Sequence, residues 1–441
     1  MRSPFRIRLT RQVRLSAHVW QRRMVFWGGA VAVGFVAVLF SIGSEYANRL
    51  FHWGLGYSPY LPLVVTPLGL ALIVFITGRF FPGSQGSGIP QSIAAISLSN
   101  HEDRKKVLSL RIAFGKIILT LSALLVGASV GREGPTVQIG SAIMYSLSRF
   151  ARFSRLEVER GLILAGGAAG IAAAFNTPLA GIVFAIEEMS RSFEERTSGN
   201  TLTAVVIAGV VSLGCMGNYS YFGHTSISLP LNLSWLAAGI CGVAGGIAGG
   251  LFSLMLISVS TNGLAGRLGA IMKKSPVLFA GACGLLLALI GLASGDLTYG
   301  TGYNEARGII EGTNNLPHSY GILKMLATLV SYLSGIPGGI FAPSLAIGAG
   351  FGDNLAGIMP FAPVGAVAIL GMVAYFSGVV QAPITAFVIV MEMTDNHSMI
   401  LPLMATSFIA YAVSRRICPK PLYKTMAEGF LLRIGSSEEK H

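Results

Sequence analysis

The sequence predicts an all-α polytopic membrane protein, and three observations carry this prediction. Only 12% of the 441 residues are charged, against about 25% in soluble domains. Hydrophobic residues make up 52% of the chain, and the mean hydropathy is +0.65. Apolar runs recur along the whole chain, and helices are the elements that satisfy their own backbone groups in lipid. This composition excludes a soluble enzyme, a disordered chain and a secreted disulfide scaffold.

The apolar runs, which we expect to form helices, differ in length and continuity. They are 24–42, 60–78, 112–130, 161–186, 203–216, 234–258, 276–293, 321–334, 362–379, 382–393 and 399–413. Several are shorter than the ~20 residues of a perpendicular span, and Gly and Pro interrupt the chain at 83–90, 131–135 and 335–343. Lipid tolerates broken backbone only where protein buries it or it lines a cavity, so the substrate site is expected at these interruptions. The polar connections 99–106, 190–200 and 294–318 are short.

Positive charge is concentrated at both ends of the chain. Residues 1–23 hold seven arginines, and the first acidic residue is Glu45. Because cationic flanks stay on the cytoplasmic side, both termini are expected in the cytoplasm, with an even number of crossings. Nucleic-acid binding is the rival explanation, but a segment beside membrane lipid explains the arginines at no extra cost, so no nucleic-acid partner is expected.

An internal repeat divides the chain into two halves. Residues 131–140 match residues 339–348 at a constant offset of 208, with Gly, Pro, Ile and Gly in register. A second block, Gly166, Pro178 and Glu187, matches Gly371, Pro383 and Glu392 at an offset of 205. Two related halves suggest an inverted repeat with a site at their interface; the alternative is convergence of glycine-rich packing sequence. The expected divisions are a basic segment 1–23, a first half 24–216, a second half 217–416 and a C-terminal segment 417–441.

Three short segments share one design, in which Gly and Pro stand just ahead of an apolar run. They are Gly86, Ser87, Gly88, Ile89 and Pro90; Gly131, Arg132, Glu133, Gly134 and Pro135; and Gly339, Ile340, Phe341, Ala342 and Pro343. Pro is favoured in the first turn of a helix, where unpaired N–H groups and the positive end of the dipole attract anions. Several such starts at one depth make an anion site without a buried Lys or Arg, which could hold the ion too tightly to release it. One such segment alone is more often a helix breaker.

These three segments, together with Lys420, Pro421, Leu422 and Tyr423, resemble the CLC family of chloride channels and proton-coupled chloride transporters. Residues 166–189 and 392–396 are similar to the same family, and the resemblance covers roughly residues 25–425. It implies a CLC-like inverted-repeat fold with tilted, broken and re-entrant helices. It also implies a homodimer with one pathway in each subunit. The short C-terminal segment implies that no CBS domains follow.

The resemblance also implies which residues bind chloride. Ser87 would direct its hydroxyl at the anion, the backbone N–H groups of Ile340 and Phe341 would bind it, and Tyr423 would donate its phenol from the cytoplasmic side. Serine at this position is typical of chloride preference, whereas proline resembles nitrate-selective members. The alternative roles are a helix N-cap for Ser87 and an interfacial belt residue for Tyr423.

Glu133 is the first candidate for the gate and the outer proton carrier. A carboxylate among helix N-termini mimics the anion and occupies its site; once protonated, it loses that attraction and swings out. The alternative is a static pair with Arg132 or another base. Lys116, in the apolar run ahead of Glu133, either favours the ionised form of Glu133 or pairs with a buried acid, and it stays outside the candidate site.

Glu188 is the candidate inner proton carrier. In the resembling transporters a glutamate at this position receives protons from the cytoplasm and passes them toward the gate. Glu187 corresponds to Glu392 in the repeat, which indicates a structural role for that pair. The alternative for Glu188 is a solvated helix end near Arg191.

Together these residues predict a secondary active transporter, not an enzyme, that exchanges chloride for protons across a bacterial inner membrane. The transported ions are the only expected ligands: there is no phosphate-binding loop for ATP, and the histidines form no metal cluster. A passive voltage- or pH-gated chloride channel is the first alternative, which Glu188 opposes because channel members usually lack an acid there. A fluoride exporter is opposed by Ser87 and the intact 131–135 segment, and a membrane protease by the missing H-E-x-x-H motif.

Overall fold

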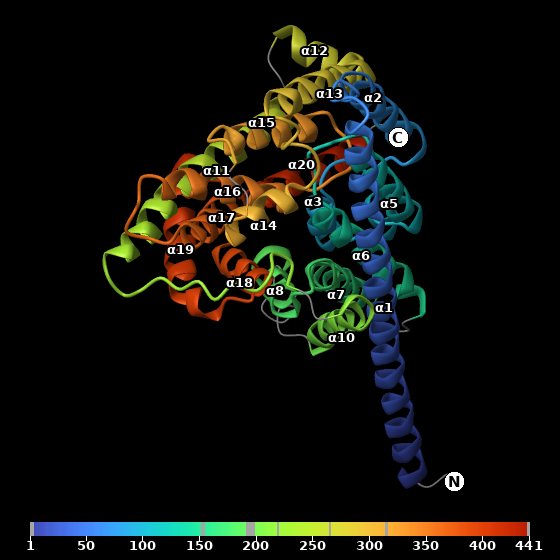
Figure 1. Cartoon of the computed structure of the whole chain (residues 1–441). Helices are drawn as coiled ribbons and strands as arrows, with labels where there is room; N and C mark the ends of the chain where they lie inside the picture. Colours follow the sequence, from blue (N-terminus) through green and yellow to red (C-terminus); the bar gives the residue numbers. More distant parts are fainter. Residues whose placement is uncertain are drawn as a thin grey trace.

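The fold is helical throughout the part of the chain that the structure describes (Figure 1). This computed structural model describes residues 4–150, 155–190, 199–217, 220–263, 266–313 and 316–438. Its helices are α1 (Pro4–Leu55), α2 (Pro62–Phe80), α3 (Ile89–Ser97), α4 (His101–Val107), α5 (Leu110–Leu125), α6 (Glu133–Ser146), α7 (Arg155–Phe175), α8 (Pro178–Phe184), α10 (Gly199–Met216), α11 (Leu236–Asn262), α12 (Gly266–Lys274), α13 (Pro276–Ala293), α14 (Tyr303–Glu311), α15 (Tyr320–Leu333), α16 (Phe341–Ala356), α17 (Val364–Val380), α18 (Pro383–Thr394), α19 (Ile400–Ile417) and α20 (Leu422–Glu438). Short turns are η1 (Leu147–Phe150), the π-helical η2 (Ala185–Met189), η3 (Leu233–Trp235) and η4 (His397–Met399). The predicted all-α fold class is confirmed.

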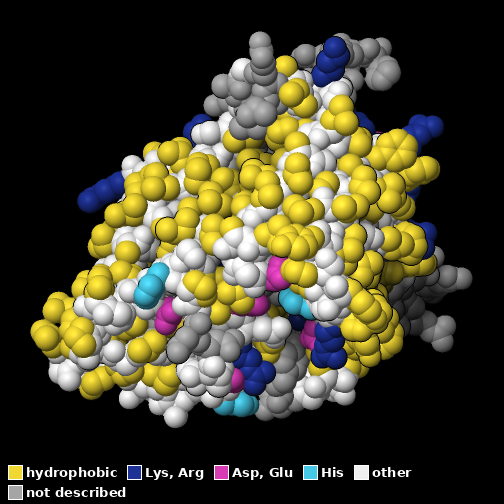
Figure 2. All heavy atoms as spheres, turned by 45° about the horizontal axis from the view of Figure 1, so that its top comes forward, with side chains coloured by type: hydrophobic (Ala, Val, Ile, Leu, Met, Phe, Trp, Pro, Cys, Tyr) yellow, Lys and Arg dark blue, Asp and Glu magenta, His cyan; other side chains and the backbone are white. Residues whose placement is uncertain are grey.

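The outer surface of the molecule is apolar. Eight helical stretches among the described residues are long and apolar enough to cross a membrane, the first running from Trp20 to Leu55 inside α1. Large apolar side chains on these helices are exposed, such as Leu68 at 66% and Leu278 at 71%. Figure 2 shows apolar side chains over most of one face, with the acidic and histidine side chains in its lower part and Lys and Arg side chains both there and at its upper edges. Soluble proteins rarely expose apolar patches this wide, so the chain is an integral membrane protein.

Two segments that the sequence predicts to be polar connections contain short helices instead. The segment 99–106 overlaps α4, and the segment 294–318 holds α14. In α4 the guanidinium of Arg104 is fully buried, where it donates to the Leu98 carbonyl and pairs with Glu159. Composition alone made this segment look like a solvated loop, because a buried, fully bonded arginine cannot be distinguished from a solvated one by residue type.

Equivalent helix pairs in the two halves approach through matched glycines. Gly140 of α6 faces Gly166 of α7, and Gly348 of α16 faces Gly371 of α17. A Cβ on any of these four glycines would collide with the facing backbone carbonyl. The two pairs are related by the offsets of the sequence repeat, so the repeat is structural and not a convergence of glycine-rich composition.

The two halves also cap one another's helices reciprocally. The Glu187 carboxylate accepts hydrogen bonds from the N–H groups of Ile384 (3.1 Å) and Thr385 (2.6 Å), at the start of α18. The Glu392 carboxylate accepts from Leu179 (3.1 Å) and Ala180 (2.6 Å), at the start of α8. Contacts that exchange equivalent partners in this way indicate a two-fold relation between the halves. The predicted structural role of the Glu187 and Glu392 pair is confirmed.

We expect Glu392→Gln to destabilise the protein by about 1–2 kcal/mol, because an amide replaces a charge-assisted cap at a helix N-terminus. Thermal unfolding of the purified protein in detergent measures this loss. Glu428→Gln is the matched control, since Glu428 is an exposed acid on α20. Equal melting temperatures for both variants and the unmodified chain would contradict a stabilising role for the cap.

Candidate functional site

The three Gly/Pro segments lie together, and each ends where a helix begins. Helices α3, α6 and α16 start at Ile89, Glu133 and Phe341, as the sequence predicts. Gly131 and Gly339 form an antiparallel bridge through two N–H···O bonds of 2.7 Å. The first segment joins them through a parallel bridge between Gly86 and Pro337. The N-terminal ends of α6 and α16 therefore start from one short backbone ladder, with α3 beside it.

Glycine at two positions permits the close approach of these segments. A Cβ at Gly134 would collide with the Ser87 hydroxyl of the first segment. A Cβ at Gly131 would collide with the Glu133 carboxylate and would lie 3.1 Å from the Pro343 ring in the third segment. These two glycines therefore allow the Ser87 hydroxyl, the Glu133 carboxylate and the start of α16 to lie close together.

Buried polar atoms without a hydrogen-bond partner among the described residues gather at this point. They include the Ser87 hydroxyl, the Tyr423 hydroxyl and both carboxylate oxygens of Glu133. The Tyr423 phenol faces Ser87 and lies within electrostatic range of both Glu133 and Glu188. A buried polar atom left unpaired costs about 1–3 kcal/mol, so a cluster of them marks a place built for a polar ligand.

The remaining predicted ligands, Ile340 and Phe341, lie at the start of α16 in the third segment. Both side chains are 1% exposed. The Phe341 ring packs against Phe376, with ring centres 4.2 Å apart, and against Phe175 at 5.5 Å. This apolar packing fixes the first residue of α16 and holds the helix start rigidly beside the unpaired hydroxyls and the carboxylate.

Glu133 is fully buried as the first residue of α6, and its carboxylate faces backbone N–H groups of Arg132, Ala342 and Glu133 itself. The Arg132 guanidinium donates to the Ser41 carbonyl (2.7 Å) and lies 3.9 Å from the Glu45 carboxylate. Arg132 thus adds positive potential beside Glu133 without forming a hydrogen bond to its oxygens. This geometry opposes the alternative of a static pair between the two residues.

Glu188 is 4% exposed, in the π-helical turn η2 at the end of α8, and its Oε1 has no hydrogen-bond partner among the described residues. Its neighbour Glu187 accepts two hydrogen bonds from the start of α18, so the two adjacent acids have different contacts. The charge of Lys424, the residue after Tyr423, acts on Glu188. The burial contradicts the alternative of a solvated helix end; Arg191 lies outside the described residues.

Lys116 has a different contact from those expected. Its ammonium is buried and donates to the carbonyls of Ser84 (2.7 Å), Gln85 (3.4 Å) and Gly86 (2.7 Å), so of the two alternatives the pair with a buried acid is wrong. It fixes the loop that leads into the first segment, because three carbonyls satisfy all three of its donors.

Two residues near the site were missed at the sequence level. Lys324 occupies the position 208 residues after Lys116, and it donates to the carbonyls of Thr298 (2.9 Å), Tyr299 (3.3 Å) and Gly300 (2.8 Å). The repeat offset was the signal that could have found it. Tyr332 lies against the Ser87 backbone and donates to the Met426 sulfur (3.2 Å), and nothing in the local sequence marks it.

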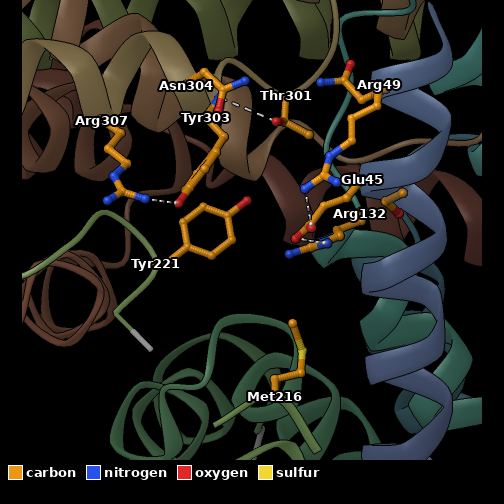
Figure 3. Close-up of a pocket in the computed structure, with 11 residues that line it drawn as sticks. Glu45, Arg49, Arg132, Met216, Tyr221, Thr301, Tyr303, Asn304 and Arg307 are labelled. Atoms are coloured by element: carbon orange, nitrogen blue, oxygen red, sulfur yellow. Dashed lines mark hydrogen bonds and ion pairs between the residues drawn. The ribbon is translucent and has the colours of Figure 1, made fainter. Parts of the chain in front are cut away.

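Two pockets are lined by residues of the Gly/Pro segments, one by the second segment and one by the first. The first, of about 420 Å³, ends at Arg132, the residue before Glu133. Figure 3 shows Glu45, Arg49 and Arg132 on one side of it, with Tyr221, Tyr303 and Arg307 opposite. The second, of about 240 Å³, is lined by Gly86 and Ser87 of the first segment and by α20 just beyond Tyr423.

The comparisons with known proteins agree with this geometry. The "H(+)/Cl(-) exchange transporter ClcA" of Citrobacter koseri is 33% identical over 415 residues, which cover 89% of this chain and 85% of that protein. The structure of a "slow cyanobacterial Cl-/H+ antiporter" is similar with a TM-score of 0.79 and 27% identity, covering 93% of this chain and 98% of the other. A CLC-type fluoride/proton antiporter, 23% identical, has the same fold with a TM-score of 0.75 over 92% of this chain and 98% of the other. The sequence model described as voltage gated chloride channel matches residues 69–415. The chain belongs to the voltage-gated chloride channel (CLC) family.

Proposed function

We propose that the protein is a secondary active transporter that exchanges chloride for protons. One observation carries the proposal: the Glu133 carboxylate is buried at the joined starts of α6 and α16, beside the hydroxyls of Ser87 and Tyr423, which have no hydrogen-bond partner in the described part of the chain. A carboxylate and a chloride ion in this position compete for the same N–H and O–H donors. Relatives named as proton/chloride exchangers support the same function.

In the proposed cycle, chloride is held by the Ser87 and Tyr423 hydroxyls and by the N–H groups of Ile340 and Phe341. Protonation of Glu133 from the outer side neutralises its carboxylate, which then loses its attraction to the helix starts and leaves the site to chloride. Glu188 exchanges protons with the cytoplasmic side. Because one carboxyl group is both plug and proton carrier, each departure of the plug is linked to a bound proton, and this links the two fluxes.

The proposal also covers the oligomeric state, the membrane and the ligands of the protein. The protein works as a homodimer with one pathway in each subunit, in a bacterial inner membrane with both termini in the cytoplasm. It is not an enzyme, and it uses no cofactor besides the transported chloride and protons.

A passive chloride channel on the same fold is the alternative, and the buried position of Glu188 opposes it because a channel has no need of an inner acid. Purified protein in liposomes with a chloride gradient and no pH gradient tests the two. An exchanger drives protons uphill and reverses at a potential that moves with pH. Reversal at the chloride Nernst potential, insensitive to pH, identifies the channel.

We expect Ser87→Pro to shift the preference from chloride toward nitrate by about tenfold, since it removes a hydroxyl donor worth about 1.5 kcal/mol to a charged ligand. Competition of nitrate with radioactive chloride uptake measures the ratio. Ser92→Ala, a buried serine further along α3, is the control. An unchanged ratio in the Ser87 variant would remove Ser87 from the selectivity ligands.

A further inference from the structure

A third pocket, of about 490 Å³, lies between the end of α2, helices α4 and α5, and the C-terminal helix α20. We call it the basic pocket. Four cations from three helices line it: Lys105 and Lys106 of α4, Arg111 of α5 and Arg433 of α20. None of the described residues that line it is acidic. The anion site and the two proton carriers lie elsewhere, so the mechanism above leaves this pocket without a role.

Two cations of the basic pocket lie beside acids of their own helix. Glu102 lies 2.9 Å from the Lys105 ammonium, and Asp103 lies 2.6 Å from that of Lys106. Both acids belong to α4 itself, and neither lines the pocket. The Lys105 and Lys106 side chains are half exposed, at 51% and 49%. An anion that enters the pocket can therefore contact both ammonium groups.

The other wall of the basic pocket is apolar. Phe81, Val107 and Phe430 line it together with neighbouring aliphatic side chains. The Phe81 ring lies 6.4 Å from that of Phe114, and Phe114, on α5, is 60% exposed on the apolar outer surface. The pocket thus joins a cluster of cations to a surface that faces lipid. Inorganic phosphate has no apolar part that would contact this wall. A lipid has both a charged headgroup for the cations and a hydrocarbon chain for the apolar side chains.

We propose that the basic pocket binds the phosphate headgroup of an anionic membrane lipid, with the lipid's hydrocarbon chains along Phe114. Basic clusters beside membrane-spanning helices recognise anionic lipids through this combination of charge and depth. Planar guanidinium groups such as those of Arg111 and Arg433 match the oxygens of a phosphate.

The bound lipid also has a direct route to the anion pathway. Phe430 and Arg433 line both the basic pocket and the 240 Å³ pocket described above, which is also lined by Ser87. Both residues are on α20, the helix that begins next to the pore residue Tyr423. A headgroup that holds Arg433 therefore restrains α20 and sets the position of the phenol. This effect on transport rests on the proposed exchange of chloride and protons, whereas lipid binding does not.

Lipid binding is measured first, by native mass spectrometry of the purified full-length protein with added phosphatidylglycerol. We expect Arg111→Gln with Arg433→Gln to weaken lipid retention about 25-fold, at about fivefold for each charge. Lys273→Gln with Lys274→Gln is the matched control, because it removes two exposed cations from α12 that lie outside the pocket. Lys105→Gln is a second test if the arginine pair impairs folding. Equal retention by the pocket variants and the unmodified protein overturns the proposal.

Transport is measured second, in liposomes of phosphatidylcholine with and without phosphatidylglycerol. We expect the anionic lipid to change chloride turnover at least twofold in the unmodified protein and in the α12 control, but not in the arginine variant. Inorganic phosphate and glycerol phosphate, added to phosphatidylcholine liposomes, distinguish the source of the anion. If either reproduces the change, the pocket binds soluble phosphate and the assignment to lipid is wrong. A protein that retains lipid yet moves no chloride contradicts the proposed exchange and leaves the binding site intact.

Discussion

Replacing Glu133 by Gln is expected to abolish proton movement while chloride flux continues. The amide has the shape of the carboxyl group, but it neither carries a proton nor competes as an anion for the helix starts of α6 and α16. We expect chloride-driven proton uptake to fall to the level of empty liposomes. Simultaneous recording of external chloride and pH in proteoliposomes measures both fluxes in one sample.

The control for this change is Glu45→Gln, which removes an acid from the 420 Å³ pocket beside Arg132, 3.9 Å from the Arg132 guanidinium. It lowers the negative charge near the gate without altering the carboxyl group that faces the N–H donors, so coupling persists. Chloride-driven proton uptake that continued in Glu133→Gln would remove Glu133 from the proton pathway.

Replacing Glu188 by Gln is expected to stop proton transport equally completely, with the outer gate left intact. Its carboxyl is buried and one oxygen is unpartnered among the described residues, so we expect this acid to take up and release protons rather than to act as a surface charge. The chloride flux of this variant should still respond to external pH through Glu133. The same proteoliposome recording, repeated over a series of external pH values, measures both properties.

Glu187→Gln is a stringent control because it makes the same replacement of a carboxyl group by an amide at the adjacent residue. Glu187 caps the start of α18 through two N–H groups, so its loss lowers the melting temperature and leaves proton coupling in place. If the Glu188 variant still pumps protons uphill, or if Glu187→Gln alone uncouples them, the assignment of the inner carrier is wrong.

The helix starts at the site could be predicted from sequence because their cause is local. Pro fits the first helical turn and Gly permits the turn before it, and the segments ending at Pro90, Pro135 and Pro343 all begin helices. The repeat was also readable, since close helix packing requires glycine at equivalent positions in both halves. The structural role of Glu187 and Glu392 followed from the repeat offset of 205 residues that relates them.

Features that depend on tertiary contacts could not be predicted. The repeat indicates a structural role for Glu187, but only the approach of α18 identifies the two N–H groups that its carboxylate caps. Lys116 faces three carbonyls of a loop about thirty residues earlier in the chain, and no pattern of residue types encodes that approach. The helical character of α4 was missed for the same reason, because the partners of its buried Arg104 come from α3 and α7.

The central claim is that chloride and the Glu133 carboxylate occupy the same place in turn. Crystals of Glu133→Gln grown in bromide, a heavier halide with anomalous scattering, test it most directly. A bromide peak beside Gly131 and the Ala342 N–H, where the carboxylate of the unmodified protein lies, is the predicted result. Bromide bound only elsewhere, with the glutamine side chain held in that position, would contradict it.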